Sequence, residues 1–458
     1  MLKNLKNNPD VIWTKTDAEC EIIYQEHLCN ILEFMKDFYP RLLENKNINP
    51  NVLFPGICKP IKSDDASIIQ LIFSGLMIIK KEEKYYSIDL SKAPSRFTSD
   101  SISEPENVMG ARDGFVENIK ENISLVRTRV KDERLNIENI KVGRRSKTMV
   151  SVLWLSDVHN LNIKNSIVKV IKKIDIDAII SIDDMMAYFS NKSVFPMYHY
   201  IGNPDTATRR FYGGEIMIII DRIPVVIMLP TTLSLSSRMK IDSLNNPPFI
   251  FLERMFVLFS CLISIFMCGV LCSFVTFQKD SLSLMVLSTL KITQDGVYLP
   301  VFIEILIILL LFELYYLIGF RQSKLTVSST IVLIGGLIIG QNLISSGMAG
   351  VFIIIITAIC FLMSFIISSN VNVIVLTSIL RLGILFSSLI YGLFGVIMGS
   401  IILGVVLYNQ KPMGVSYLYP FLPFDEKEIV RFFSSSTSLN NVKRNKILKI
   451  RNIFRRRK

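Results

Sequence analysis

The chain has 458 residues, a net charge of +12 and seven cysteines. At about 150 residues per domain, this length predicts two or three domains. The cysteines form no CxxC motif and have no companion histidine spacing, which argues against a disulfide framework and favours reduced thiols. The three histidines, His27, His159 and His199, are far apart in sequence and are interpreted as solitary structural or surface residues.

Residues 1–97 are predicted to form a small soluble α+β subdomain. Apolar residues in Glu21–Leu43 have the spacing of a helix, and the apolar run Ser67–Lys80 is typical of a strand. A turn leads into Tyr85–Leu90, which alternates like a partner strand. The N-terminus has no apolar h-region, so we expect no cleaved signal peptide and a soluble region that stays in the cytosol.

Residues 98–250 are predicted to form a second soluble α+β subdomain. Within Glu104–Arg134, Asp113 is expected to cap a helix whose apolar face contains Phe115, Ile119 and Ile123. Arg127 and Arg129 follow on the same stretch. Two interpretations remain open: a phosphate-contacting loop or interaction surface, or an ordinary capped helix with a charged face.

Further elements follow in the second subdomain. Thr148–Leu155 has the β-branched and aromatic content of a strand, Lys164–Ile174 has helical spacing, and Ala178–Ile182 is predicted to be a short buried strand. Glu215–Leu229 consists of two apolar runs broken by Asp221 and Arg222, which predicts two strands joined by a tight turn.

The chain becomes lipid-like after residue 254. Of the 154 residues in Met255–Tyr408 only nine are charged, and Met255–Phe277 and Met348–Ser369 contain no charge. A helix needs about 20 apolar residues to cross a hydrocarbon core about 30 Å thick. Residues 251–410 are therefore predicted to form a polytopic helical membrane domain with about four to six inserted segments, which include Leu299–Phe320 and Leu325–Ser345.

The last apolar stretch, Val371–Tyr408, is too long for one crossing. As a single helix its 38 residues would extend about 57 Å, so we predict two inserted pieces with a bend near Tyr391 and Gly392. Glycines four residues apart let helices approach closely and are candidates for packing between subunits, namely Gly336 and Gly340, then Gly395 and Gly399.

Four strongly polar residues lie within the predicted spans: Glu304, Glu313, Gln341 and Arg381. Ionisable groups inside lipid are costly and usually face protein or water, which makes them candidate membrane-pathway residues. The two glutamates are nine residues apart and therefore face opposite sides of a helix. The alternative interpretation is an internal Glu–Arg pair that only fixes packing.

Residues 411–458 are predicted to be a cytosolic basic tail. Val442–Lys458 carries nine positive charges and no acid, which favours attraction to anionic membrane lipid at about 1 kcal/mol per residue, or a solvated tail. Nucleic-acid binding ranks lower because Phe454 is the only aromatic residue available for stacking. The positions of the basic residues also predict that both termini are cytoplasmic.

Four ordered motifs resemble the GerA family of spore germination proteins, specifically the A-type subunit of nutrient germinant receptors. They are EPENVMGARDGFVENIKENISLVRTRVKDERL (104–135), FPMYHYIGNPDTATRRFYGGEIMIIIDRIPVVIMLPTT (195–232), RLGIL (381–385) and GVSYLYPFLP (414–423). The residues in the two soluble motifs that match the family signature are Glu104, Pro105, Gly110, Arg112, Gly114, Phe115, Glu117, Asn122, Arg127, Arg129, Pro204, Asp205, Pro224 and Pro230.

The resemblance implies a receptor subunit in the inner membrane of a bacterial spore. It implies work with B-type and C-type partner subunits, and assembly into a pentameric, nutrient-gated ion channel. Neither property follows from composition or spacing.

The predicted fold is a membrane protein in which a cytosolic α+β N-terminal domain of two subdomains precedes a polytopic α-helical membrane domain. No P-loop, nucleophile elbow, metal-ligand spacing or kinase signature is found, so we predict no enzyme activity, no catalytic or metal site and no cofactor. A secondary transporter and a membrane scaffold that anchors germination partners remain the alternative functions.

Overall fold

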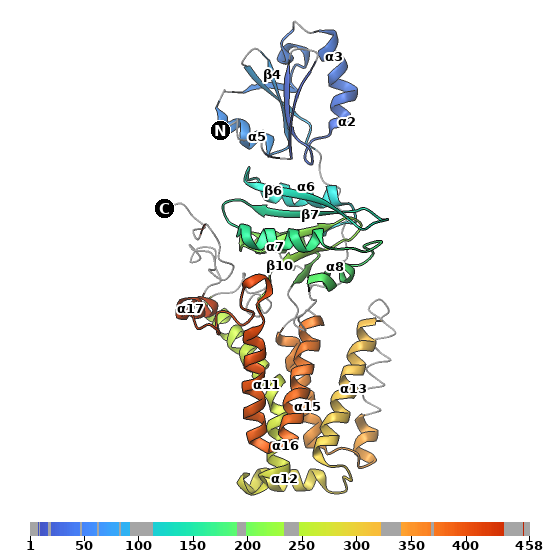
Figure 1. Cartoon of the computed structure of the whole chain (residues 1–458), viewed down its shortest axis with the longest axis vertical. Helices are drawn as coiled ribbons and strands as arrows, with labels where there is room; N and C mark the ends of the chain where they lie inside the picture. Colours follow the sequence, from blue (N-terminus) through green and yellow to red (C-terminus); the bar gives the residue numbers. More distant parts are fainter. Residues whose placement is uncertain are drawn as a thin grey trace.

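The computed structural model describes residues 8, 10–16, 20–45, 48–61, 64–81, 84–91, 113–189, 198–232, 247–321, 340–367, 371–434 and 452. Figure 1 shows two sheet-containing units stacked above a bundle of long helices. The α+β soluble region and the helical region that follows it are therefore confirmed. The linker Ala93–Asp100, motif residues 104–112 and most of the basic tail lie outside the described residues.

The first unit is built on a five-stranded antiparallel sheet with the order β1-β2-β4-β5-β3. Side chains alternate across this sheet, because Ile22 and Tyr24 join one apolar cluster and Ile23 joins another on the opposite face. The elements are β1 (Val11–Lys15), β2 (Glu21–Gln25), α2 (Ile31–Glu33), η1 (Phe34–Phe38), α3 (Tyr39–Glu44), α4 (Pro50–Leu53), β3 (Cys58–Ile61), α5 (Asp65–Ile72), β4 (Leu76–Lys81) and β5 (Lys84–Asp89).

Two sequence predictions for this unit were wrong in part. Glu21–Leu43 is not one helix, because its first five residues form β2, which lies between β1 and β4. Ser67–Lys80 is not one strand, since α5 occupies its first half and only β4 is extended. The β4–β5 pairing agrees with the predicted partner strands.

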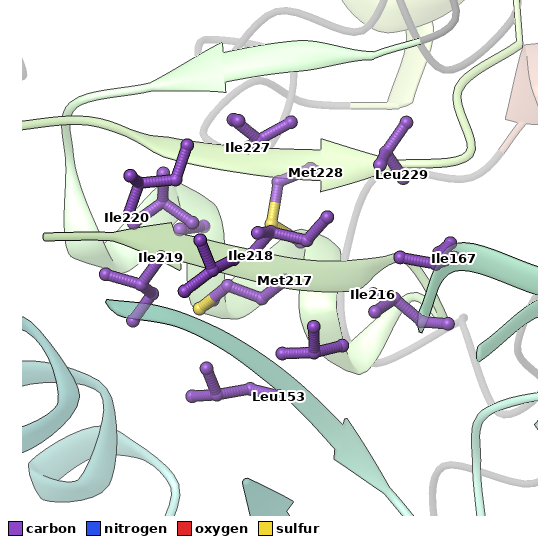
Figure 2. Packing of buried hydrophobic residues seen from close by; sticks show 14 of the residues in the cluster. Leu153, Ile167, Ile216, Met217, Ile218, Ile219, Ile220, Ile227, Met228 and Leu229 are labelled. Atoms are coloured by element: carbon purple, nitrogen blue, oxygen red, sulfur yellow. The ribbon is translucent and has the colours of Figure 1, made fainter. Parts of the chain in front are cut away.

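The second unit contains a five-stranded antiparallel sheet with the order β6-β7-β9-β10-β8. All five residues of β9 are buried, so both faces of this strand are covered, and Figure 2 shows its side chains packed with those of β7, β10 and α7. The elements are α6 (Ile119–Arg129), β6 (Leu135–Val142), β7 (Thr148–Leu155), α7 (Leu161–Lys172), α8 (Ile182–Phe189), β8 (His199–Ile201), α9 (Pro204–Tyr212), β9 (Ile216–Ile220) and β10 (Val226–Leu229).

The predicted strand over Ala178–Ile182 is wrong: this segment is irregular, and α8 begins at Ile182. The predicted strand Thr148–Leu155 and the two strands within Glu215–Leu229 are confirmed as β7, β9 and β10. Arg222 in the turn between β9 and β10 has φ of 67°, a left-handed conformation that a non-glycine residue adopts at a cost.

In the described part of the helical region, three helices are long and apolar enough to cross a membrane: Phe251–Phe277, Val301–Ile318 and Val373–Asn409. They belong to α11 (Pro247–Phe277), α13 (Val301–Arg321) and α16 (Val371–Asn409). Shorter elements complete this region: η3 (Lys279–Ser281), α12 (Leu284–Gln294), α15 (Val351–Ile367), η4 (Pro412–Gly414) and α17 (Glu426–Ser434). Most of the predicted span Leu325–Ser345, with Gly336, lies outside the described residues.

Helix α16 is a hairpin, which confirms the bend predicted near Tyr391 and Gly392. Gly392 has φ of 59° and ψ of −136°, which are not helical values. Beyond it the chain reverses, because a Cβ on Gly395 would lie 1.9 Å from the Ser387 carbonyl oxygen, whereas a straight helix would separate these residues by about 12 Å. Leu376 and Leu407, near the two ends of α16, pack in one cluster with Tyr417.

The glycine pair in this hairpin has a different role from the predicted one. Gly399 packs against Ser387 and Ile384 of the opposite arm, just as Gly395 packs against Ser387. Gly395 and Gly399 therefore allow the two arms of one chain to approach, and the prediction that they pack between subunits was wrong.

The segment after the hairpin returns to the soluble region. Val415 is 3 % exposed and belongs to the apolar core of the second unit, with Met413 and Tyr419 packed against the same core. Further along, the Phe432 and Phe433 rings of α17 meet edge to face, and the Arg254 guanidinium of α11 lies 5.2 Å from the Phe432 ring centre. The first part of the predicted tail is thus packed against both regions.

Candidate functional site

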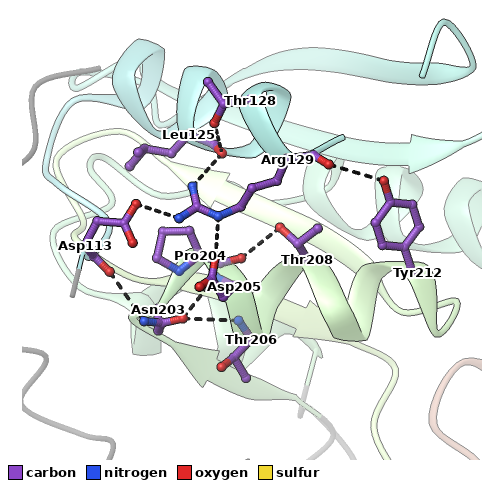
Figure 3. Close-up of polar contacts among 10 residues, drawn as sticks. All are labelled: Asp113, Leu125, Thr128, Arg129, Asn203, Pro204, Asp205, Thr206, Thr208 and Tyr212. Carbon is purple, nitrogen blue, oxygen red and sulfur yellow. Dashed lines mark hydrogen bonds and ion pairs between the residues drawn. The ribbon is translucent and has the colours of Figure 1, made fainter. Parts of the chain in front are cut away.

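The soluble motifs meet at a group of four residues that we call the Arg129 junction: Asp113, Arg129, Asn203 and Asp205 (Figure 3). Arg129, at the end of α6, binds Asp205 through Nε at 2.5 Å and Asp113 through an Nη atom at 2.6 Å. Burial acts to lower the pKa of Arg129, but hydrogen bonds and charge from the two aspartates outweigh it and raise the pKa. The guanidinium therefore stays cationic.

Asn203 positions the second half of the Arg129 junction. Its side-chain oxygen accepts hydrogen bonds from the backbone N–H groups of Asp205 and Thr206 and so caps α9, which begins at Pro204. Its side-chain nitrogen donates to the Asp113 carbonyl at 3.4 Å. The prediction that Asp113 caps a helix was wrong. Asn118 caps α6 instead, by accepting from Lys120 N–H.

The remaining described motif residues stabilise the same unit. Asn122 is fully buried, and its amide bonds both the N–H and the C=O of Val116, at 2.8 and 2.6 Å. Phe115 is fully buried in the core, and the Glu117 carbonyl accepts from Arg222 N–H at 2.7 Å. Gly114 lies between Asp113 and Phe115, while Pro224 and Pro230 flank β10.

Arg127 connects the two soluble units. Its guanidinium, fully buried, forms an ion pair with Asp10 and donates to the Asp132 and Leu135 carbonyls at 3.1 and 2.9 Å. It also lies 5.2 Å from the Phe73 ring centre. No local sequence pattern indicates this pairing, because 117 residues separate the two partners.

In the helical bundle, Arg381 is buried and lies beside α11. Its Nε donates to the Ser264 carbonyl at 2.7 Å and an Nη atom donates to the Ser264 hydroxyl at 3.0 Å. Its guanidinium carbon lies 6.0 Å from the Phe361 ring centre. Within the described residues Arg381, Glu304 and Glu313 bond to Ser264, Gly350 and Ser378, so the direct Glu–Arg pair is not found there.

The two glutamates contact different helices, as their spacing predicted. Glu304 is 1 % exposed and accepts from Gly350 N–H, just before α15, at 3.0 Å. Glu313 accepts from the Ser378 hydroxyl on α16. Gln341 is exposed on this single chain. The four predicted membrane-pathway residues are therefore not gathered in one place, and the partners Ser264, Gly350 and Ser378 were not identified from sequence.

Taken together, the α+β soluble region, the apolar helices and the buried polar groups define a multi-pass membrane protein. A family model described as Bacillus/Clostridium GerA spore germination protein matches residues 1–447. The chain therefore belongs to the GerA family of spore germination proteins, as the resemblance of its motifs indicated.

Several relatives match most of the chain. Spore germination protein XA of Bacillus anthracis is 28% identical over 415 residues, which cover 88% of this chain and 84% of that protein. Stage V sporulation protein AF of Bacillus subtilis is 26% identical, and the match covers 91% of this chain and 86% of that protein. Spore germination protein B1 of Bacillus subtilis is 26% identical, and the match covers 81% of this chain and 77% of that protein.

A solved structure also matches: the N-terminal domain of the A subunit of the Bacillus megaterium spore germinant receptor GerK3. It is 19% identical, has a TM-score of 0.36, and covers 50% of this chain and 91% of that chain.

Proposed function

We propose that this protein is the A-type subunit of a nutrient germinant receptor and forms a nutrient-gated ion channel as a cyclic homo-oligomer. The observation that carries the proposal is the burial of charged side chains in an otherwise apolar bundle. Arg381 and Glu304 are each 1 % exposed, and an ionisable group at membrane depth is costly enough to indicate a function.

A ring of subunits would supply what one chain lacks. A single bundle has too few polar groups to surround a hydrated pore, whereas a ring repeats each carboxylate, and a carboxylate ring favours cations. The outer surface of the α16 hairpin carries exposed apolar residues that suit contact with lipid or a neighbouring subunit, including Phe386, Ile390, Phe394 and Ile402. Closed cyclic symmetry is a common way to satisfy such interfaces, and the family resemblance implies a pentamer.

The soluble region would transmit the nutrient signal to this pore. Val415 joins the end of the α16 hairpin to the core of the second sheet, so a change in the soluble region reaches the hairpin through packed atoms. By resemblance, B-type and C-type subunits are the partners, and the inner spore membrane is the location, with both termini cytoplasmic.

Conductance of the purified full chain in liposomes tests the channel. We expect cation current from the parent and altered current when Arg381 or Glu313 is neutralised, with expression and oligomeric state verified. Solute uptake by the isolated protein, without current, would favour a transporter. Absence of both current and solute uptake, with germination unchanged after neutralisation, would favour a scaffold.

Deletion of the gene tests the biological role. Spores that lack it should form normally and respond more slowly to one nutrient or nutrient set. Normal germination with every nutrient, in a strain that also lacks paralogous receptors, would contradict the assignment.

A further inference from the structure

At the end of the helical bundle farthest from the two sheets, the helices α12, α13 and α15 lie close together. Figure 1 shows α12 lying across this end, where it precedes the start of α13. The loops there are tied together, because Tyr298 N–H donates to the Gly347 carbonyl at 3.1 Å. We call the group formed by Thr293, Gln294, Glu304 and Gly350 the Glu304 junction.

Glu304 is only half satisfied by its hydrogen bonds. The Oε2 atom accepts from Gly350 N–H at 3.0 Å, but Oε1 is buried and has no hydrogen-bond partner in the described part of the chain. No lysine or arginine among those residues forms an ion pair with it. A buried carboxylate without a compensating charge is costly, and either a proton or a bound cation removes this cost.

Other polar groups converge on the same place. A Cβ on Gly350 would lie 3.0 Å from the Thr293 carbonyl oxygen, 3.5 Å from Gln294 Cγ and 3.7 Å from Glu304 Oε2. Thr293 lies in the last turn of α12, where carbonyls lack intrahelical partners and carry the negative end of the helix dipole. The carbonyl and the carboxylate therefore present negative charge to one small volume.

Gln294 adds a third group. Its Nε2 atom is buried and, within the described residues, has no hydrogen-bond acceptor. A half-turn of the amide exchanges its nitrogen and oxygen, which are nearly indistinguishable in shape. That rotation would replace a buried donor that lacks an acceptor with an oxygen ligand beside Glu304.

We propose that the Glu304 junction binds a monovalent alkali cation, K⁺ or Na⁺, through Glu304 Oε1, the Thr293 carbonyl and the Gln294 side chain. All three groups supply hard oxygen ligands. One carboxylate balances one positive charge, whereas a divalent ion would leave an uncompensated charge in a buried site. The proposal deepens the channel function, on which its physiological role rests, and gives the membrane region a cation site opposite the soluble region.

Thermal unfolding of the purified full chain in detergent tests this binding. The midpoint is compared in KCl, in NaCl and in choline chloride at the same ionic strength, since choline is too large for the junction. We expect K⁺ or Na⁺ to raise the midpoint by about 5 °C at a hundredfold excess over the dissociation constant. Glu304→Gln should abolish the rise, and Glu426→Gln, at an exposed position of α17, should retain it.

Equal midpoints in all three salts, or an undiminished rise in Glu304→Gln, would overturn the proposal. Gln294→Glu supplies a second test that does not require the Glu304 variant to fold. It places a second carboxylate at the site, so Ca²⁺ should now raise the midpoint by several °C beyond its effect on the parent. If Gln294→Glu and the parent respond alike to Ca²⁺, the site assignment fails. Because no current is measured, either failure leaves the liposome test of the channel intact.

Discussion

Arg127 on α6 and Asp10, just before β1, form a buried ion pair that joins the two sheet-containing units. Asp10→Asn should destabilise the contact between the units, because a buried guanidinium would lose its countercharge at a cost of about 3–5 kcal/mol. Hydrogen exchange should become faster in β1 and remain slow in β7. Asp175→Asn, which removes a partner from the exposed pair with Arg144, is the control and should change neither strand.

The Arg129 junction makes a separate prediction. Arg129→Met should lower the free energy of unfolding of the soluble region by about 2 kcal/mol, since Asp113 and Asp205 lose their shared partner at a partly buried site. Chemical denaturation of the full chain in detergent measures this loss. Asp205→Asn in the Arg129→Met background should restore part of it. Unfolding of Arg129→Met at the same denaturant concentration as the parent would contradict the structural role.

Glu138 should make the stability of the second unit depend on pH. Burial acts to raise the pKa of Glu138, but hydrogen bonds and charge from Lys164 and Lys172 outweigh it and lower the pKa below its ordinary value. A carboxyl whose pKa is lower in the folded state stabilises the fold above its unfolded pKa, and this stabilisation is lost as pH falls through the folded value. Free energies of unfolding measured from pH 6 down to pH 3 should fall less steeply for Glu138→Gln. Parallel curves would refute this.

The two arms of the α16 hairpin pack closely at Gly395. Gly395→Val should prevent their approach, because even a Cβ at this position would overlap the Ser387 carbonyl oxygen. Gly404→Val is the matched control, since a Cβ there meets no atom within 4 Å. The yield of monodisperse protein after detergent extraction should fall for the first variant alone; equal yields would show that the arms do not touch.

Membrane sidedness follows from the course of the helices. Ser288→Cys on α12 and Tyr391→Cys at the hairpin bend should react with an impermeant maleimide from one side of the membrane. Lys427→Cys on α17 should react only from the other. The cysteines in the described residues are buried or only partly exposed, so the parent supplies a low background. Labelling of all three positions from one side would refute this arrangement.

Length and apolar pattern predicted much of this fold. The bend near Gly392 follows from a helix too long for a bilayer, and β9 and β10 follow from two apolar runs separated by a polar pair. Where a prediction was wrong, a neighbouring residue took the role that the pattern had assigned. Asp113 lies in a position suited to a cap, but Asn118 is nearer the start of α6 and leaves Asp113 for Arg129. The domain boundary at residue 97 stays a prediction, because it falls outside the described residues.

Contacts between distant segments were beyond the reach of sequence patterns. Glu304 was identified as a costly residue in lipid, but nothing in its neighbourhood indicated Gly350, 46 residues later, as its partner. A pair between Arg381 and a glutamate was one of two interpretations, and Ser264 on another helix supplies the hydrogen bonds of Arg381 instead. Burial can be read from composition, whereas the identity of a partner depends on how helices pack.

The position of Val415 in the core of the second unit has a consequence for the order in which the chain is made and packed. This residue follows the last apolar helix in sequence, yet it completes a core whose strands lie between residues 135 and 229. The ribosome therefore makes those strands well before the side chain that joins their core, and several helices are synthesised in between. The soluble fold reaches its full packing only after those helices have been made, so a chain cut short before Val415 carries an unfinished core that quality-control proteases can recognise.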